Sequence, residues 1–161
     1  MSIEFKKVSD FNRGILFELL KDSYSFDYRY EESWYSNWQA CDNFSFDNLQ
    51  IADKYGFITT RNDEAIGFVS WNPRNIPEYA EIGYNCIASK HKSNGYGKIQ
   101  LQEAVDRITQ NDVKKIIVTT NDDLIPAQRM YEGVVFKIHQ KKTNQKIADF
   151  TSEHIDYVYY L

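Results

Sequence analysis

The sequence predicts a mixed α/β fold, in which helices flank a sheet whose strands are mostly antiparallel. In the second half of the chain predicted strands alternate with helices, whereas in the first half and at the C-terminal end strands follow one another directly. A chain of 161 residues, 42% hydrophobic and 26% charged, is long enough to bury one core. We therefore expect residues 1–161 to form a single domain.

The first half of the chain contains recognisable strand and helix patterns on either side of an ambiguous stretch. Residues 26–50 have no clean period and predict a mixture of helix and loop, and residues 72–77, with two prolines, predict a loop. The regular elements expected here are a strand at 3–8, a helix capped by Ser9 or Asp10 with its apolar stripe ending at Leu20, and strands at 55–60 and 65–71 joined by a hairpin turn at 61–64.

The second half predicts a strand–helix–strand–helix order followed by two closing strands. Both helices have apolar residues at i, i+3, i+4 and i+7, which is the helical period. The elements are a strand at 80–88, a helix with its stripe at 101–108, a buried strand at 115–120, a helix with its stripe at 127–134, and strands at 134–140 and 155–161. Alternation along the first strand puts Glu81, Gly83 and Asn85 on one face, and Ile82, Tyr84 and Cys86 on the other.

A polar loop with Gly95 and Gly97 separates the strand at 80–88 from the following helix. A glycine-rich turn at a helix start points unpaired N–H groups and a positive dipole end outward, so it suits a phosphate or diphosphate. A P-loop is excluded, because it needs glycine at Lys92 and serine or threonine at Ile99. A dinucleotide fingerprint is excluded, because it needs glycine at Gln100.

The segment Lys92–Gly97, KSNGYG, is similar to the acyl-CoA loop [QR]-x-x-G-x-[GA] of the GNAT acetyltransferases. The preceding strand, YAEIGYNCI, resembles the fourth strand of that family, and Ala127 with Tyr131 matches its A-x-x-x-Y, followed by Phe136. Together these matches cover roughly residues 80–136. Three positions depart from the family pattern: Lys92 replaces Gln or Arg, Leu124 stands where the family has Asn (the nearest is Asn121), and Val135 replaces Gly.

The resemblance implies the GNAT acyl-CoA N-acyltransferase fold and transfer of the acetyl group of acetyl-CoA to a primary amine, by direct attack in a ternary complex. It implies Tyr131 as the acid that protonates the leaving thiolate and Glu81 as the base, with Tyr84 or an acid of the 22–53 segment as rivals. The cofactor contacts that it implies are Cys86, Ile87, Lys92, Ser93, Asn94, Gly95, Tyr96, Gly97, Lys98, Asn121 and Ala127.

Residues 22–53 are both acidic and aromatic, with one arginine against seven acids and nine aromatic rings. Such a segment attracts a cationic acceptor, such as a polyamine, an aminoglycoside or a peptide amine, through charge and cation–π contacts. The alternative is an amphipathic helical region whose rings are core and whose acids are solvated. The acids are Asp22, Asp27, Glu31, Glu32, Asp42, Asp47 and Asp53.

Composition narrows the remaining function classes. A net charge of −4 and a pI near 5.4 disfavour nucleic-acid binding, and no apolar run approaches the roughly 20 residues that span a membrane. Neither the two cysteines nor the three histidines have metal-ligand spacing, so no metal is expected, and with no signal-peptide pattern we expect a cytoplasmic protein. Edge strands allow a homodimer. Two rival functions stay open: a non-catalytic acyl-CoA-binding or sensing domain, and an enzyme on another α/β fold that binds a nucleotide or phosphorylated metabolite.

Overall fold

A computed structural model describes residues 2–121, 137–143 and 153–160. Its strands form one seven-stranded sheet in the order β1-β2-β3-β4-β5-β7-β6, in which only the β4–β5 pair is parallel among the described ladders. The prediction of a mixed, mostly antiparallel sheet is therefore confirmed. The strands are β1 Ile3–Lys6, β2 Gly56–Arg61, β3 Glu64–Asn72, β4 Ala80–Ile87, β5 Lys115–Asn121, β6 Lys137–Thr143 and β7 Glu153–Tyr160.

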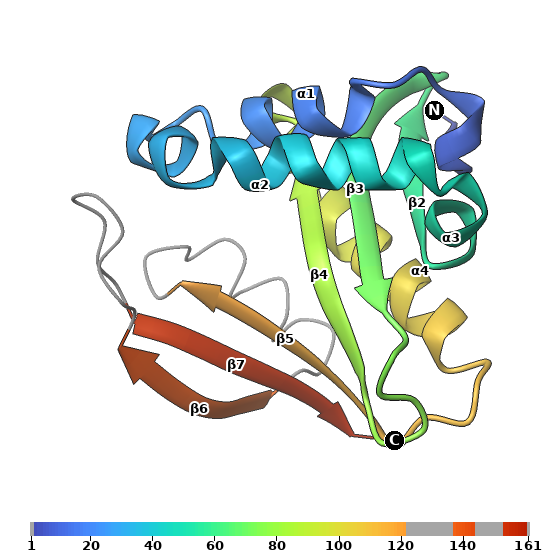
Figure 1. Cartoon of the computed structure of the whole chain (residues 1–161), viewed down its shortest axis with the longest axis vertical. Helices are drawn as coiled ribbons and strands as arrows, with labels where there is room; N and C mark the ends of the chain where they lie inside the picture. Colours follow the sequence, from blue (N-terminus) through green and yellow to red (C-terminus); the bar gives the residue numbers. More distant parts are fainter. Residues whose placement is uncertain (1, 122–136, 144–152, 161) are drawn as a thin grey trace.

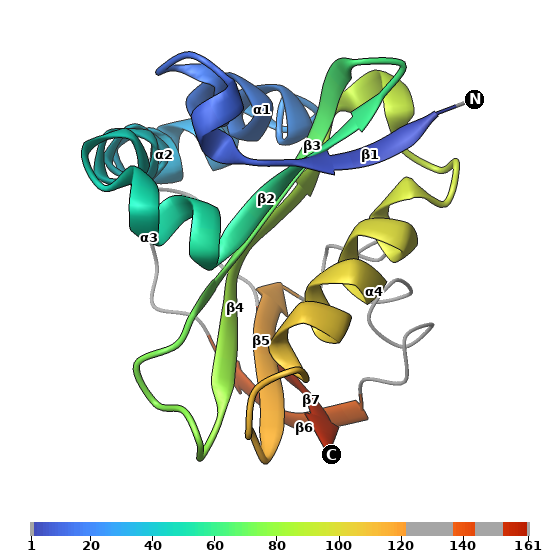
Figure 2. The same ribbon diagram turned by 90° about the vertical axis from the view of Figure 1, so that its right-hand side faces the viewer.

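Helices cover both faces of the sheet (Figures 1 and 2). One face carries α4, whereas α1 and α2 cross the other. The helical elements described are η1 Val8–Asp10, α1 Ile15–Ser23, α2 Tyr28–Asp47, α3 Leu49–Lys54, η2 Ser89–His91 and α4 Tyr96–Ile108, where η marks a 3-10 helix. The predicted helix at 127–134 lies outside the described residues.

Two hydrophobic clusters, one on each face, hold these layers together. On the α4 face, Leu101 and Ile108 pack against strand residues such as Ile82 and Ile116. On the other face, Leu16 and Leu20 of α1 pack with Phe68. All seven side chains are at most 3% exposed. The apolar stripe predicted for the helix after the glycine loop is thus confirmed as its buried face.

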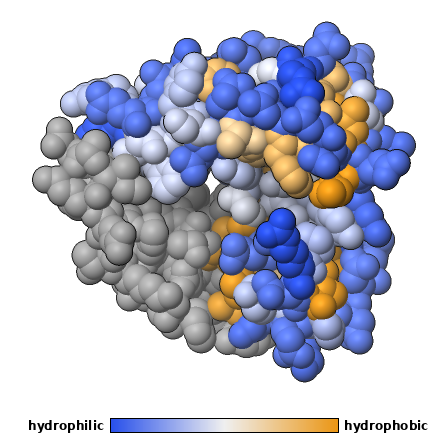
Figure 3. Space-filling model, in the orientation of Figure 1, coloured by the Kyte–Doolittle hydropathy of each residue, from blue (hydrophilic) through white to orange (hydrophobic). Residues whose placement is uncertain are grey.

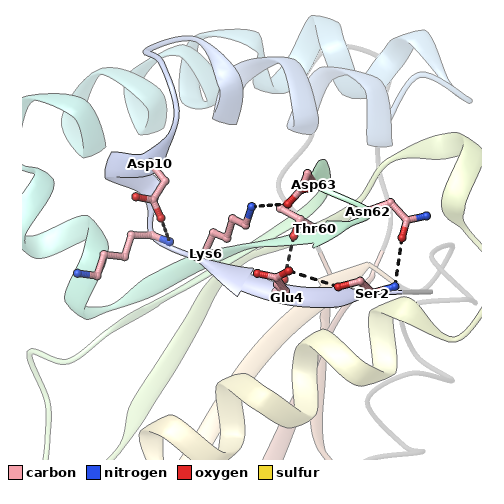
Figure 4. Close-up of polar contacts among 8 residues, drawn as sticks. Ser2, Glu4, Lys6, Asp10, Thr60, Asn62 and Asp63 are labelled. Carbon is pink, nitrogen blue, oxygen red and sulfur yellow. Dashed lines mark hydrogen bonds and ion pairs between the residues drawn. The ribbon is translucent and has the colours of Figure 1, made fainter.

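The hairpin predicted between 55 and 71 is confirmed, and it anchors the edge strand β1. Asn62 and Asp63 in its turn both have positive φ, at 50° and 67°, a conformation that Asn and Asp tolerate. Figure 4 shows Asn62 accepting a hydrogen bond from the Ser2 N–H (3.2 Å) and Asp63 paired with the Lys6 ammonium (2.8 Å). A side-chain and a backbone contact therefore tie this turn to both ends of β1.

The mixture of helix and loop predicted for residues 26–50 is wrong, because most of this stretch is α2, a single 20-residue helix. Tertiary contacts explain why the period was hidden. Tyr30 and Trp38 are buried, and Asp42, fully buried, accepts hydrogen bonds at 2.9–3.3 Å from the N–H groups of Gly14, Leu16 and Phe17 at the start of α1. The carboxylate of Asp42 thus caps α1. Because it occupies a buried position of α2, where an amphipathic helix normally has an apolar residue, the helical period of α2 is hard to recognise in the sequence.

The exposed side of α2 is largely hydrophilic, with apolar atoms toward the end that adjoins α3 (Figure 3). The exposed large apolar side chains of this region include Phe44, at 51%, and Ile51, at 45%. No helix in the described ranges is long and apolar enough to cross a bilayer.

Candidate active site

The strands β4 and β5 separate partway along their length (Figure 1). Their parallel pairing stops at Ile82 and Val118, yet β4 continues beside β3 to Ile87 and β5 continues beside β7 to Asn121. From residue 83 onward, none of the described strands pairs with the edge of β4 that faces β5. A strand edge of this kind can bind an extended ligand that carries amides.

Gly83 is an extra residue in β4 at the point where the strands separate. Trp71 of β3 pairs with Ile82, but the neighbouring Ser70 pairs with Tyr84, so Gly83 is bulged. A Cβ at this position would meet no atom within 4 Å in the part of the chain that the structure describes. A bulge bends the strand that carries it, and this one lies directly after the last β4–β5 pair.

The bulge also corrects the predicted alternation along β4. Ala80 and Ile82 pack on the α4 face, whereas Tyr84 and Cys86 pack with the cluster of α1 and α2. Tyr84 and Ile82 therefore lie on opposite faces, not on one face as strict alternation predicts. Glu81, exposed between two residues of the α4 face, shares the other face with Tyr84.

A glycine-capped helix start follows the carboxyl end of β4. Ser93 and Gly95 have positive φ, at 65° and 83°, and Gly95 is the N-cap of α4, with no side-chain capping bond. The first turn, Tyr96–Lys98, therefore offers backbone N–H groups and the positive end of the helix dipole to a ligand. A helix start of this kind suits an anion, and the predicted role of residues 93–98 in cofactor binding stays a prediction.

The side chain of Lys92 does not extend over this turn. Its ammonium donates to the carbonyl oxygen of Ser23 at the end of α1 and lies 4.7 Å from the centre of the Phe26 ring. Partial burial lowers the pKa of Lys92. The adjoining Ser89 N–H donates to the Asp22 carboxylate at 2.8 Å, so the loop before α4 is tied to the end of α1 at two points.

The two cysteines and Tyr84 are held in their neutral forms. Burial raises the pKa of Cys86 and of Cys41 to about 12 each, and that of Tyr84 to about 12. The Tyr84 hydroxyl donates to the backbone oxygen of Asn37 at 3.4 Å. A neutral, buried thiol is a poor nucleophile, which argues against an acyl-enzyme at Cys86.

Sequence reasoning missed Gln100, a polar side chain fully buried under α4. The two hydrogens of its amide nitrogen are shared among three acceptors, Asn85 Oδ1 (2.7 Å) and the carbonyl oxygens of Phe68 and Cys86 (both 3.1 Å), and its oxygen accepts from Thr59 Oγ1 (2.8 Å). The available signal was its position four residues before Ala104, on the apolar stripe of the helix.

Most acids of the 22–53 segment have structural partners. Five of the seven accept hydrogen bonds from described donors: Asp22, Asp27, Asp42, Asp47 and Asp53. Glu31 lies 3.8 Å from the Lys21 ammonium. Together with Glu18, Asp22 and Ser25, these two line an open depression of about 270 Å³. The acids thus act in structural hydrogen bonds. The rings are divided, because Tyr30 and Trp38 are buried whereas Phe26, Tyr28, Tyr35 and Phe44 are exposed.

The remaining predicted site residues are only partly described. Asn121 is the last residue of β5, and only its backbone is described. Ala127 and Tyr131 lie outside the described residues, so their relation to β4 stays a prediction. Over the described ranges, no three His, Cys, Asp or Glu side chains gather as metal ligands.

Comparison with known proteins identifies the family of this chain. The model of the acetyltransferase (GNAT) family matches residues 15–134. Among curated proteins no sequence matches the chain. Among solved structures, the ribosomal-protein-S18-alanine N-acetyltransferase from Escherichia coli is similar, with a TM-score of 0.71, 14% identity, and coverage of 98% of this chain and 91% of that one.

Two further structures have the same fold. A GNAT family acetyltransferase from Elizabethkingia anophelis with acetyl-CoA bound has a TM-score of 0.67 at 15% identity, covering 99% of this chain and 97% of that one. The IAA acetyltransferase from Bacillus cereus has a TM-score of 0.64 at 14% identity, covering 99% of both chains. The expected GNAT fold is confirmed, and the chain belongs to the acetyltransferase (GNAT) family.

Proposed function

We propose that the protein is an N-acetyltransferase that moves the acetyl group of acetyl-CoA to a primary amine. The observation that supports this most directly is the separation of β4 from β5 beside the start of α4, where the N-cap Gly95 makes no side-chain capping bond. An extended arm with two amides can pair with the β4 edge, and a diphosphate can bind the helix start. A structural neighbour with 15% identity has acetyl-CoA bound.

In this proposal the cofactor follows the backbone from β4 to α4. The edge of β4 near Cys86 and Ile87 binds the pantetheine arm and the thioester oxygen, and the N–H groups of residues 93–98 bind the diphosphate. Because the Lys92 ammonium is bonded to Ser23, we assign Lys92 a role in holding the loop, not in contacting phosphate with its side chain. Contacts from Asn121 and Ala127 remain part of the proposal.

The chemistry is direct acyl transfer in a ternary complex. The neutral amine nitrogen attacks the thioester carbonyl carbon, the C–N bond forms, the C–S bond breaks, and the leaving thiolate takes a proton from the phenol of Tyr131. The proton lost by the amine goes to Glu81, directly or through water. The neutral state of Cys86 favours this route over an acyl-enzyme.

Glu81 is preferred over its rivals as the base. Tyr84, with a pKa near 12, keeps its proton at neutral pH and is unsuited to accept another. Five acids of the 22–53 segment already accept hydrogen bonds within the fold. Glu81 is exposed on the face away from α4, where a substrate has access to it.

We propose a cationic small-molecule or peptide amine as the acceptor. The structural support for a cationic acceptor is the depression whose lining includes Glu18, Asp22 and Glu31. The rest of the acidic segment does not contribute to this support. Three carboxylates against the one ammonium of Lys21 leave the depression with a net negative charge, which attracts a positively charged group of an acceptor.

A ligand panel followed by an acceptor screen tests the function. Acetyl-CoA is expected to raise the melting temperature, with no comparable rise from ATP or NAD, because only an acyl-CoA uses both the β4 edge and the helix start. Stabilisation by ATP or NAD alone would favour the nucleotide-binding rival. Release of CoA thiol is then measured across polyamines, aminoglycosides and peptides.

The Tyr131→Phe variant separates an enzyme from a sensor. Removal of a general acid is expected to lower kcat about 10²-fold or more while acetyl-CoA binding is retained. A wild-type protein that binds acetyl-CoA but acetylates no amine of the panel would support the non-catalytic acyl-CoA-binding domain instead.

A further inference from the structure

Gln100 links three strands to α4 from a fully buried position. Its amide oxygen accepts from Thr59 of β2, and its amide nitrogen donates to the Phe68 carbonyl of β3 and to two acceptors in β4. Carbonyl oxygens only accept hydrogen bonds, so the nitrogen must face them and the oxygen must face Thr59. The orientation of the amide is therefore fixed by its partners.

Gly67 of β3 makes room for this amide. A Cβ at Gly67 would lie 2.4 Å from Gln100 Oε1 and 2.8 Å from the carbonyl oxygen of Cys86, so a larger residue and the observed amide cannot both occupy this space. The polar link therefore depends on a glycine in one strand and a glutamine in a helix 33 positions later in the sequence.

The β4 partners of Gln100 lie at the separated edge of the sheet. Asn85 and Cys86 follow the Gly83 bulge, beyond the last β4–β5 pair. Gln100 itself lies in the second turn of α4, five residues after the Gly95 cap. One side chain thus connects the strand edge and the helix start, the two regions that the proposed function assigns to opposite ends of one cofactor.

A hydrophobic residue would suit this buried position for stability alone. Leu101 and Ala104 beside it already hold α4 against the sheet by apolar contact, which is strong but not directional. Hydrogen bonds to specific strand atoms instead set how far along the sheet the helix sits, and a misplacement of about 1 Å in a binding site can cost about 10²-fold in rate.

We propose that Gln100 is a positioning residue, which holds the β4 edge and the start of α4 at the separation that acetyl-CoA spans. This inference rests on the proposed function, because it needs one ligand that occupies both places. It acts through Asn85 and Cys86 and through the helix, without contact between Gln100 and the cofactor.

The test compares the whole cofactor with its two halves. Gln100→Met keeps the length of the side chain but removes all four hydrogen bonds. Calorimetry then measures the Kd of acetyl-CoA, of 3′-phospho-ADP and of pantetheine. We expect a loss of about tenfold or more for acetyl-CoA and less than about twofold for each half, because only the whole cofactor needs both regions in register.

Thr59→Val is the matched control, since it removes one hydrogen bond of Gln100 but leaves its bonds to β4 in place. It is expected to lower the melting temperature without weakening acetyl-CoA binding. Equal acetyl-CoA affinity in folded Gln100→Met and wild type would overturn the proposal, as would equal losses for the cofactor and both halves. If wild type itself does not bind acetyl-CoA, the proposed function fails first, and the positioning role with it.

If Gln100→Met does not fold, the Asn85→Ala variant tests the positioning role instead. It removes one acceptor of the Gln100 amide, Asn85 Oδ1 of β4, without changing a side chain of the hydrophobic core. A selective loss for acetyl-CoA over its halves supports the positioning role, and an unchanged ratio contradicts it.

Discussion

Replacement of Gly67 by alanine should destabilise the protein strongly through a single methyl group. The added Cβ would lie 2.4 Å from Gln100 Oε1, 2.6 Å from Ile87 Cδ1 and 2.8 Å from the Cys86 carbonyl oxygen. The first two atoms belong to side chains that can turn. The third belongs to the backbone of β4, in the strand pair of which Gly67 is part, so it cannot move without disturbing the ladder.

The expected magnitude follows from two contributions. Overpacking of a close-packed core costs about 1–3 kcal/mol. Movement of the Gln100 amide weakens some of its four hydrogen bonds, at about 0.5–1.5 kcal/mol each. We expect a loss of about 3 kcal/mol in the free energy of unfolding, which corresponds to a fall in melting temperature of about 6–12 °C for a domain of this size.

Gly83→Ala is the control for the general effect of alanine at a strand glycine. A Cβ at Gly83 meets no atom of the described residues within 4 Å, and the φ of Gly83 is not in the left-handed region. This variant should unfold at or slightly above the wild-type temperature, because alanine restricts the unfolded chain. Both are measured by thermal and urea unfolding. A Gly67→Ala protein that melts within about 1 °C of wild type would refute the packing described around Gln100.

Two further predictions test the cap of α1 and the two thiols. Asp42→Ala should lower the free energy of unfolding, measured in urea, by about 3 kcal/mol, and Asp42→Asn should lower it by less, because the amide keeps an acceptor for the N–H groups of α1. Equal stability of wild type and both variants would contradict this cap. In the native protein at pH 8, Ellman's reagent should label neither Cys41 nor Cys86 within minutes, but both after unfolding, since burial raises each pKa to about 12. The unfolded chain loses these protons near pH 9 while the folded protein keeps them, so their contribution to stability is full below pH 9 and declines as the pH rises toward 12. Rapid native labelling at pH 8, or stability that does not fall above pH 9, would show that the thiols are not buried as described.

Local signals account for the parts of the fold that sequence predicted well. The hairpin around Asn62 and the stripe from Leu101 to Ile108 depend on residues close together in the chain. The glycine turn before α4 is equally local, because a positive φ at the N-cap Gly95 needs no distant partner.

Contacts between distant residues explain what sequence reasoning missed. The helix α2 lacks a clear apolar period because Asp42, on its buried face, accepts hydrogen bonds from the N–H groups at the start of α1. The two faces of β4 were misassigned because the bulge at Gly83 arises from pairing with β3, and a period of two has no place for an extra residue.

By itself the sequence determined the mixed α/β class, the glycine turn before α4 and the resemblance to the acetyltransferase (GNAT) family, because each depends on residues that are close together in the chain. Only the tertiary structure decided which face Glu81 shares, where the Lys92 ammonium goes and what Gln100 holds together. Those outcomes depend on strand register and on the close approach of α1, α4 and β4, and such proximity is a property of the packed chain.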